Sequence, residues 1–244
     1  MRKSREYRTW AWTKLGENGG WTAAVVAGLV AWFVPMIVNR TLQQVSGLSN
    51  LQQILISLQS GETTIEQLYG NDPAAFVSQL SSYALWFSFT MLVMYYLQAV
   101  FGFGLASLSI AVMRGGAKVR HVFTGFGRGW RLLWMEALAQ FYVACWALLF
   151  IVPGILAALS YELRYFIRVD HPDWSGDRCI TESKRLMKGN RWRYFKLCLS
   201  FLGWWLLSAA TFGLALVFVI PYFNTAKAAF YEDLLDTADQ ERTM

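Results

Sequence analysis

Residues 73–113 read PAAFVSQLSSYALWFSFTMLVMYYLQAVFGFGLASLSIAVM and contain no Asp, Glu, Lys or Arg. A helix of about 20 apolar residues spans the hydrocarbon core of a bilayer, which is about 30 Å thick. Because lipid offers no partners for backbone polar groups, such a segment must be helical there. The stretch therefore predicts an α-helical membrane protein, with a crossing within residues 83–113 that tilts, bends or extends beyond the core.

The whole chain of 244 residues is also rich in apolar residues, since 55% of it is hydrophobic and only 16% is charged. A soluble domain of this size carries about a quarter charged residues. The net charge of +6 could indicate nucleic-acid binding, but the Lys and Arg residues cluster in short segments beside the apolar runs. That placement follows the positive-inside bias of membrane proteins, so we expect no nucleic-acid partner.

The N-terminal third predicts an anchor followed by an outer segment. Residues 1–20 carry five basic residues with aromatic residues between them, which is typical of a cytoplasmic interfacial segment, and residues 21–38 form the first transmembrane helix. Residues 39–82 hold one basic residue against Glu62, Glu66 and Asp72, which indicates the extracytoplasmic side. Apolar residues recur there every three to four positions, so we expect an amphipathic surface helix, with a break at Asp72-Pro73.

Residues 83–235 are expected to form a repeat-containing membrane domain, followed by a tail over residues 236–244. Small residues on one face of the second crossing, among them Gly102 and Gly104, allow another helix to approach closely. The glycines of residues 125–129 only superficially resemble a phosphate-binding loop, because no strand precedes them.

Residues 132–167 must enter and leave the membrane on one side, because both flanking segments, 114–131 and 168–196, are strongly basic. A helical hairpin that breaks at Pro153-Gly154 satisfies this requirement. The return leg is short, so a re-entrant half-helix is the alternative.

A similar sequence to that of the predicted hairpin recurs later in the chain. Residues 147–153 read ALLFIVP and residues 215–221 read ALVFVIP. A Trp-Arg pair precedes each copy and a Tyr-Glu pair follows it: Trp130-Arg131, Tyr161-Glu162, Trp192-Arg193 and Tyr231-Glu232. Both copies start from a cytoplasmic basic segment, which indicates a repeat in the same direction. If the second copy breaks near residues 211–213 or Pro221, the C-terminus returns to the cytoplasm; a single crossing would leave it outside.

We therefore expect an all-α, polytopic membrane helical bundle. It would contain about six membrane-embedded helices, with two similar helix-Pro-helix units, plus interfacial amphipathic helices. Both ends of the chain are expected to face the cytoplasm.

Several short stretches carry a resemblance to a known family. They are WALLFIVPGI at 146–155 with Tyr161, SKRLMKG at 183–189, WRYF at 192–195, LSFLGWW at 199–205, Pro221-Tyr222 and FYEDL at 230–234. Together they resemble the bacterial integral-membrane family called domain of unknown function 975, over about residues 80–235. The resemblance implies a multi-pass protein of the bacterial inner (plasma) membrane, distantly similar to the membrane domain attached to some glycerophosphodiester phosphodiesterases. It implies no activity.

Catalytic and metal-binding signals are weak. The chain has only two histidines, and it lacks the HExxH, P-loop and GxSxG patterns. Its three cysteines indicate packing rather than disulfides. We expect no enzyme activity, no metal and no cofactor.

Ionisable residues inside apolar segments are stronger candidates for a functional site. Placing each of them in the membrane costs several kcal/mol of free energy unless it is paired or hydrated. Their positions relative to Pro153 and Pro221 predict a polar cluster near the inner side of the bundle. Its members are Glu136, Glu162, Arg164, Lys227 and Glu232. Ion pairs that lock the helices together are one interpretation, and a pathway for a substrate or a proton is the other.

A short basic amphipathic helix is predicted between Ser175, which can cap it, and Gly189, which ends it. With the residues that follow, it forms a cytoplasmic basic surface of Arg178, Lys184, Arg185, Lys188, Arg191 and Arg193. Expected partners are membrane lipids with anionic headgroups, further copies of the chain, or a partner membrane protein.

These features favour a transport-related function, in which the protein moves or helps to move a peptide, a lipid or a small amphiphile. The alternative is a non-catalytic membrane scaffold or accessory subunit that docks a partner through its basic cytoplasmic face. A lipid-handling enzyme or its membrane subunit is a third and weaker interpretation.

Overall fold

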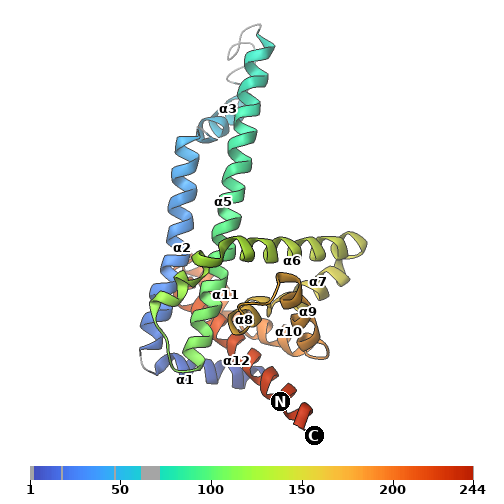
Figure 1. Ribbon diagram of the computed structural model, residues 1–244. Helices are drawn as coiled ribbons and strands as arrows, with labels where there is room; N and C mark the ends of the chain where they lie inside the picture. Colours follow the sequence, from blue (N-terminus) through green and yellow to red (C-terminus); the bar gives the residue numbers. More distant parts are fainter. Residues whose placement is uncertain (1–2, 18, 47, 62–71, 244) are drawn as a thin grey trace. The chain divides into compact units, whose positions relative to one another are not determined.

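The computed structural model describes residues 3–17, 19–46, 48–61 and 72–243, and it consists of helices joined by turns, without a strand among these residues (Figure 1). This confirms the all-α prediction. The chain divides into two compact units. We call residues 1–31 with 99–244 the main unit, and residues 32–98 the small unit.

Two helices, α2 (Gly20–Val45) and α5 (Pro73–Met113), are long and apolar enough to cross a membrane. Each is longer than predicted, since α2 continues past residue 38 and α5 begins well before residue 83. The predicted break lies at the start of α5, where the Asp72 carboxylate accepts hydrogen bonds from the backbone N–H groups of Ala74 and Ala75. Pro73 occupies the first helical position, where its missing N–H costs nothing.

The small unit contains the second part of α2, helix α3 (Leu48–Ser60) and the first part of α5. Helix α3 confirms that the apolar repeat after the first predicted crossing is helical. Glu62 and Glu66, two of the acidic residues used to assign this segment to the outer side, lie outside the described residues.

The main unit holds α1 and the C-terminal elements, together with the ends of α2 and α5 that belong to it. Its elements are α1 (Ser4–Gly16), the 3₁₀ helix η1 (Val119–Arg128), α6 (Gly129–Leu149), α7 (Ile151–Tyr161), α8 (Arg164–Asp170), α9 (Gly176–Met187), α10 (Arg191–Ser200), α11 (Leu202–Ala210) and α12 (Leu216–Thr243). Helix α1 packs against α10 and α12, so both ends of the chain lie on this unit (Figure 1).

Helices α6 and α7 pack against each other as the predicted hairpin. The break falls at Phe150, which is extended, and not at Pro153-Gly154. Pro153 instead lies in the first turn of α7, where a proline is tolerated. Gly154 serves packing: a Cβ added there would lie 2.8 Å from the Cα of Ala147, so the two helices could not approach as closely.

The second copy also forms a hairpin, from α11 and α12. Its turn lies at residues 211–215, where Phe212 and Gly213 have positive φ values of 50° and 88°. Of the two breaks considered from the sequence, the one near residues 211–213 is therefore confirmed. Pro221 lies inside α12 and does not end a helix.

The 3₁₀ helix η1 packs against the face of α5 that carries small residues. A Cβ on Gly104 would lie 2.1 Å from the carbonyl oxygen of Val122, and one on Gly125 would lie 2.5 Å from the carbonyl oxygen of Val100. Each glycine thus admits the backbone of the other element, as predicted for α5. Gly125 has this packing role in place of any phosphate-loop role.

Helix α9 matches its prediction closely. The Ser175 hydroxyl accepts a hydrogen bond from the Arg178 backbone N–H, and Gly189 follows the helix with a φ of 82°. Its inner face holds Ile180, Ser183 and Met187, which are all buried. Ser183 donates to the carbonyl oxygen of Ser160 and accepts from the N–H of Leu163, so this buried hydroxyl joins α9 to the end of α7.

Candidate functional site

The predicted polar cluster centres on Glu136 of α6, which is 2% exposed. One carboxylate oxygen accepts hydrogen bonds from Arg164 Nη2 at 2.6 Å, Arg164 Nε at 3.0 Å and the Tyr165 hydroxyl at 2.6 Å. The other oxygen accepts from the Gln140 amide at 3.0 Å. Every oxygen of this buried carboxylate therefore has a partner, as a buried charge requires.

A second ion pair lies beside the first. Lys227 of α12 donates to Glu162, which directly follows α7, at 2.9 Å. The ammonium group also lies 5.1 Å from the centre of the Phe223 ring. Four of the five predicted residues thus form two ion pairs that tie α6 to α8 and the end of α7 to α12. We call Glu136, Arg164, Glu162 and Lys227 the central cluster.

Glu232, the fifth predicted residue, does not pair within the central cluster. It accepts a hydrogen bond from Arg114 Nε at 2.9 Å, and the same guanidinium binds Asp170 through two bonds of 2.8 and 3.0 Å. The Tyr231 hydroxyl donates to Asp170 at 2.9 Å. The hydrogen bonds and charge of these two carboxylates, Asp170 first, raise the pKa of Arg114 and keep it charged.

Sequence reasoning did not include Arg114 and Asp170 in a site. The available signal was the position of Arg114, directly after the longest uncharged stretch of the chain. A cation at that point is held at the end of an apolar helix, where acidic side chains of other segments can reach it. Which acid would reach it was not readable from spacing, because Asp170 lies 56 residues further along.

Arg193 was assigned to the basic surface, and the structure corrects this. Its guanidinium donates to Asp233 at 2.8 Å and to Asn190 at 2.7 Å, and it also contacts the Tyr7 hydroxyl. Tyr7 is 1% exposed. Burial, followed by the hydrogen bond to Asp233, raises the pKa of Tyr7, so it stays a neutral donor.

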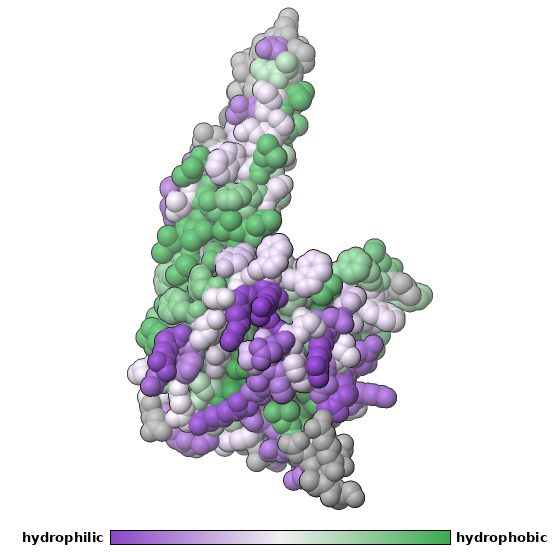
Figure 2. Space-filling model, in the orientation of Figure 1, coloured by the Kyte–Doolittle hydropathy of each residue, from purple (hydrophilic) through white to green (hydrophobic). Residues whose placement is uncertain are grey.

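The rest of the basic surface matches its prediction in part. Arg178, Lys184, Arg185 and Lys188 are exposed, and Arg191 is half-buried. Arg178 stacks over the Trp174 ring at 4.1 Å, and Arg185 pairs with Glu182 at 2.5 Å. Figure 2 shows hydrophilic side chains gathered on one face of the main unit, while hydrophobic ones cover the end of the α6–α7 hairpin.

The central cluster consists of two ion pairs in which each charged group contacts its partner directly. Each acid faces a base, and the cations are fixed by further contacts to Tyr161, Tyr165 and Phe223. Among the described residues, no group of three or more His, Cys, Asp and Glu side chains is placed to hold a metal ion. The arrangement can couple helices tightly, because each ion pair joins two different helices or their ends.

Comparison with known families gives a match to part of the chain. The family described as "Protein of unknown function (DUF975)" matches residues 151–238, which run from the start of α7 into α12. This confirms the family resemblance over the part of the chain that supplies Arg164, Glu162 and Lys227. No curated protein and no solved structure matches the chain.

Proposed function

We propose that this protein is an integral membrane scaffold. In this proposal α2 and α5 cross the bilayer, and the main unit is a rigid platform that binds anionic lipid and docks a partner protein at the cytoplasmic face. The observation that carries the proposal is the complete pairing of the central cluster, Glu136 with Arg164 and Glu162 with Lys227.

The lengths and surfaces of α2 and α5 support the membrane part of the proposal. At 26 and 41 residues they extend over about 39 and 61 Å, more than the roughly 30 Å of a hydrocarbon core. Large apolar side chains on both are exposed in the small unit, where Ile37 is 60% and Leu85 is 73% accessible. A surface of this kind is stable in lipid and unfavourable in water.

The proposed topology follows from the main unit alone. Because α1 packs on α12, we place the two ends of the chain on one side of the membrane. Two crossings, by α2 and α5, agree with this. The basic segments of the same unit favour the cytoplasmic side, through the positive-inside bias.

The two hairpins would complete about six membrane-embedded helices. Helices α7 and α11, with 11 and 9 residues, extend over only about 16 and 14 Å and are too short to cross. Their turns expose Leu148 at 86% and Phe212 at 101%. We therefore propose that both hairpins are re-entrant, with apolar turns that insert into the bilayer and return.

The ion pairs favour a scaffold over a charge-transfer pathway. A proton or substrate pathway needs ionisable groups that can exchange partners. Here Glu136 already accepts four hydrogen bonds and Arg164 is held by Glu136, Tyr161 and Tyr165. Such pairs fix helices relative to each other, and breaking one is strongly unfavourable.

Transport is the second candidate, and the repeated hairpins favour it. Two similar re-entrant units in one chain are a common way to build a pathway for a peptide, lipid or small amphiphile. In that case the central cluster would line the pathway and its neutralisation would stop flux.

Reconstitution separates these functions. The chain is inserted into liposomes as wild type and as E162Q/K227M, which removes both charges of one pair together. The scaffold proposal expects no protein-dependent flux of a fluorescent anionic amphiphile from either form, and resistance of both to alkaline extraction. Flux that the double variant abolishes would replace the scaffold with transport. Release of the wild type by alkaline extraction would end the membrane assignment.

A further inference from the structure

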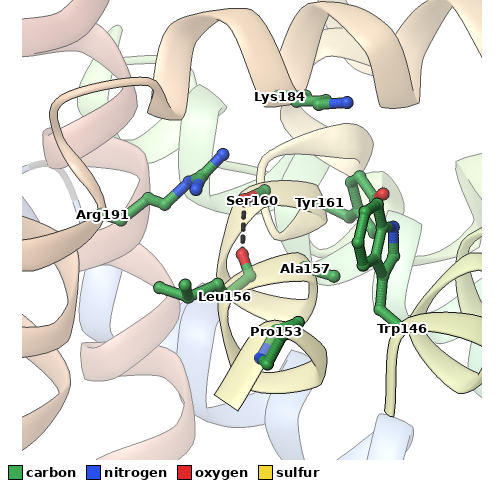
Figure 3. A pocket seen from close by; sticks show the side chains of 8 residues that line it. All are labelled: Trp146, Pro153, Leu156, Ala157, Ser160, Tyr161, Lys184 and Arg191. Atoms are coloured by element: carbon green, nitrogen blue, oxygen red, sulfur yellow. Dashed lines mark hydrogen bonds between the residues drawn. The ribbon is translucent and has the colours of Figure 1, made fainter. Parts of the chain in front are cut away.

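A cavity of about 260 Å³ lies between α7, the end of α6, and the α9–α10 segment (Figure 3). Its walls differ in chemistry. Pro153, Leu156 and Ala157 of α7 supply an apolar side, and Trp146 of α6 adds an aromatic ring. The opposite side carries two cations, Lys184 of α9 and Arg191 at the start of α10. The cavity is therefore amphipathic.

Neither of the two cations forms an ion pair among the described residues. Arg164, Lys227, Arg193 and Arg114 all bind carboxylates of the chain itself. Lys184 is exposed at the rim of the cavity, and Figure 3 shows Arg191 reaching into it. Two unneutralised positive charges at one cavity favour an anionic occupant.

Arg191 gives an independent indication of a ligand. Its Nε atom is buried and has no hydrogen-bond partner among the described residues. Leaving a buried charged donor unsatisfied is costly, so such a group normally has an acceptor. An oxyanion in the cavity would supply that acceptor, and a guanidinium binds phosphate through two parallel hydrogen bonds.

We propose that this cavity binds the phosphate group of an anionic phospholipid. Arg191 and Lys184 would hold the phosphate, and the acyl chains would leave the cavity along α7. The proposal rests on the membrane placement of the hairpins under the proposed function, and it identifies the lipid class that the scaffold takes.

The surface around the cavity supports a lipid over a free phosphate. The cavity has room for a phosphate and its linker but not for acyl chains, whose volume must be accommodated outside it. Exposed apolar residues of α7 continue from its wall: Leu156 is 41%, Ile155 is 52% and Val152 is 65% accessible. A soluble phosphate has no apolar part that could cover these exposed side chains, whereas the acyl chains of a lipid could.

The test compares lipid binding by three forms of the full-length protein in detergent micelles, titrated with phosphatidylglycerol or phosphatidylcholine and read by native mass spectrometry. K184Q/R191Q removes the two cavity cations. R120Q/R128Q is the matched control, since it removes two exposed basic residues of η1 that do not line the cavity. Thermal unfolding of each form establishes that the fold is kept.

We expect the wild type and the control to prefer phosphatidylglycerol, and K184Q/R191Q to lose roughly thirtyfold in affinity for it while its affinity for phosphatidylcholine is unchanged. Equal losses in both double variants would overturn the site, because they would indicate binding to general surface charge. Displacement of the lipid by an equal concentration of glycerol phosphate would overturn the lipid assignment and leave a free-phosphate site. All of these readouts are separate from alkaline extraction, which tests the membrane placement.

Discussion

The hydroxyl of Tyr7 donates a hydrogen bond of 2.7 Å to Asp233, which joins α1 to α12 across 226 positions of the sequence. Arg193 of α10 binds the same carboxylate oxygen at 2.8 Å. The Tyr7 ring also packs edge-on against Phe230, with 5.4 Å between the ring centres. The two ends of the chain are therefore parts of one packed unit.

This contact predicts that both ends are accessible from the same side of the membrane. Cysteines introduced at Lys3 and Gln240, each in a background without the three native cysteines, should react equally with a membrane-impermeant maleimide. In intact cells neither should react, and in inverted vesicles both should. Labelling of the two positions from opposite sides would contradict the α1–α12 packing.

Neutralising Glu136 should destabilise the protein strongly. E136Q leaves the guanidinium of Arg164 buried without its counter-charge, a change that costs about 3–5 kcal/mol of unfolding free energy. The measurement is thermal or denaturant unfolding in detergent micelles.

The matched comparison is the second pair of the central cluster. E162K/K227E exchanges the two charges and should recover part of the stability that either single change loses, because Glu162 and Lys227 contact each other directly. A double variant as unstable as the sum of the single ones would show that the pair is not coupled.

Enlarging Gly104 should release η1 from α5. G104V places a side chain where the carbonyl of Val122 lies, and overpacking of this kind costs about 1–3 kcal/mol or more. The freed segment should become sensitive to trypsin at Arg120 and Arg128. G127A is the control, because a Cβ at Gly127 meets no atom within 4 Å; it should be cleaved no faster than the wild type.

His121 should make the stability of the η1 region depend on pH. Burial first, and then the charge of Arg120, lower the pKa of His121 from its usual 6.5, and its Nδ1 accepts a hydrogen bond from the Lys118 backbone N–H. The folded state thus binds fewer protons than the unfolded state at mildly acid pH. Stability is full above about pH 6.5 and falls as the pH drops below it.

The melting temperature of the wild type should accordingly decrease more than that of H121Q between pH 7.5 and pH 5.5. Glutamine keeps an acceptor but does not titrate. Identical pH profiles for the two forms would assign the acid sensitivity to other groups.

Several elements could be predicted from the sequence because their signals are local. The uncharged stretch before Arg114 indicated α5, and the spacing between Ser175 and Gly189 indicated α9 with its cap and its buried face. Both hairpins followed from the two similar apolar copies between basic segments. Helix periodicity, capping and charge placement act over a few residues, so the chain itself displays them.

Only the tertiary structure decided which charged groups meet. Spacing placed Glu136, Glu162, Arg164, Lys227 and Glu232 at similar depth, but Glu232 pairs with Arg114 and Arg193 lies at Asp233. The turn at Phe150 and the cavity below Arg191 likewise depend on how α6, α7 and α10 pack. An ion pair is fixed by the distance between side chains on separate helices, and that distance depends on the packing of the whole unit rather than on any local pattern.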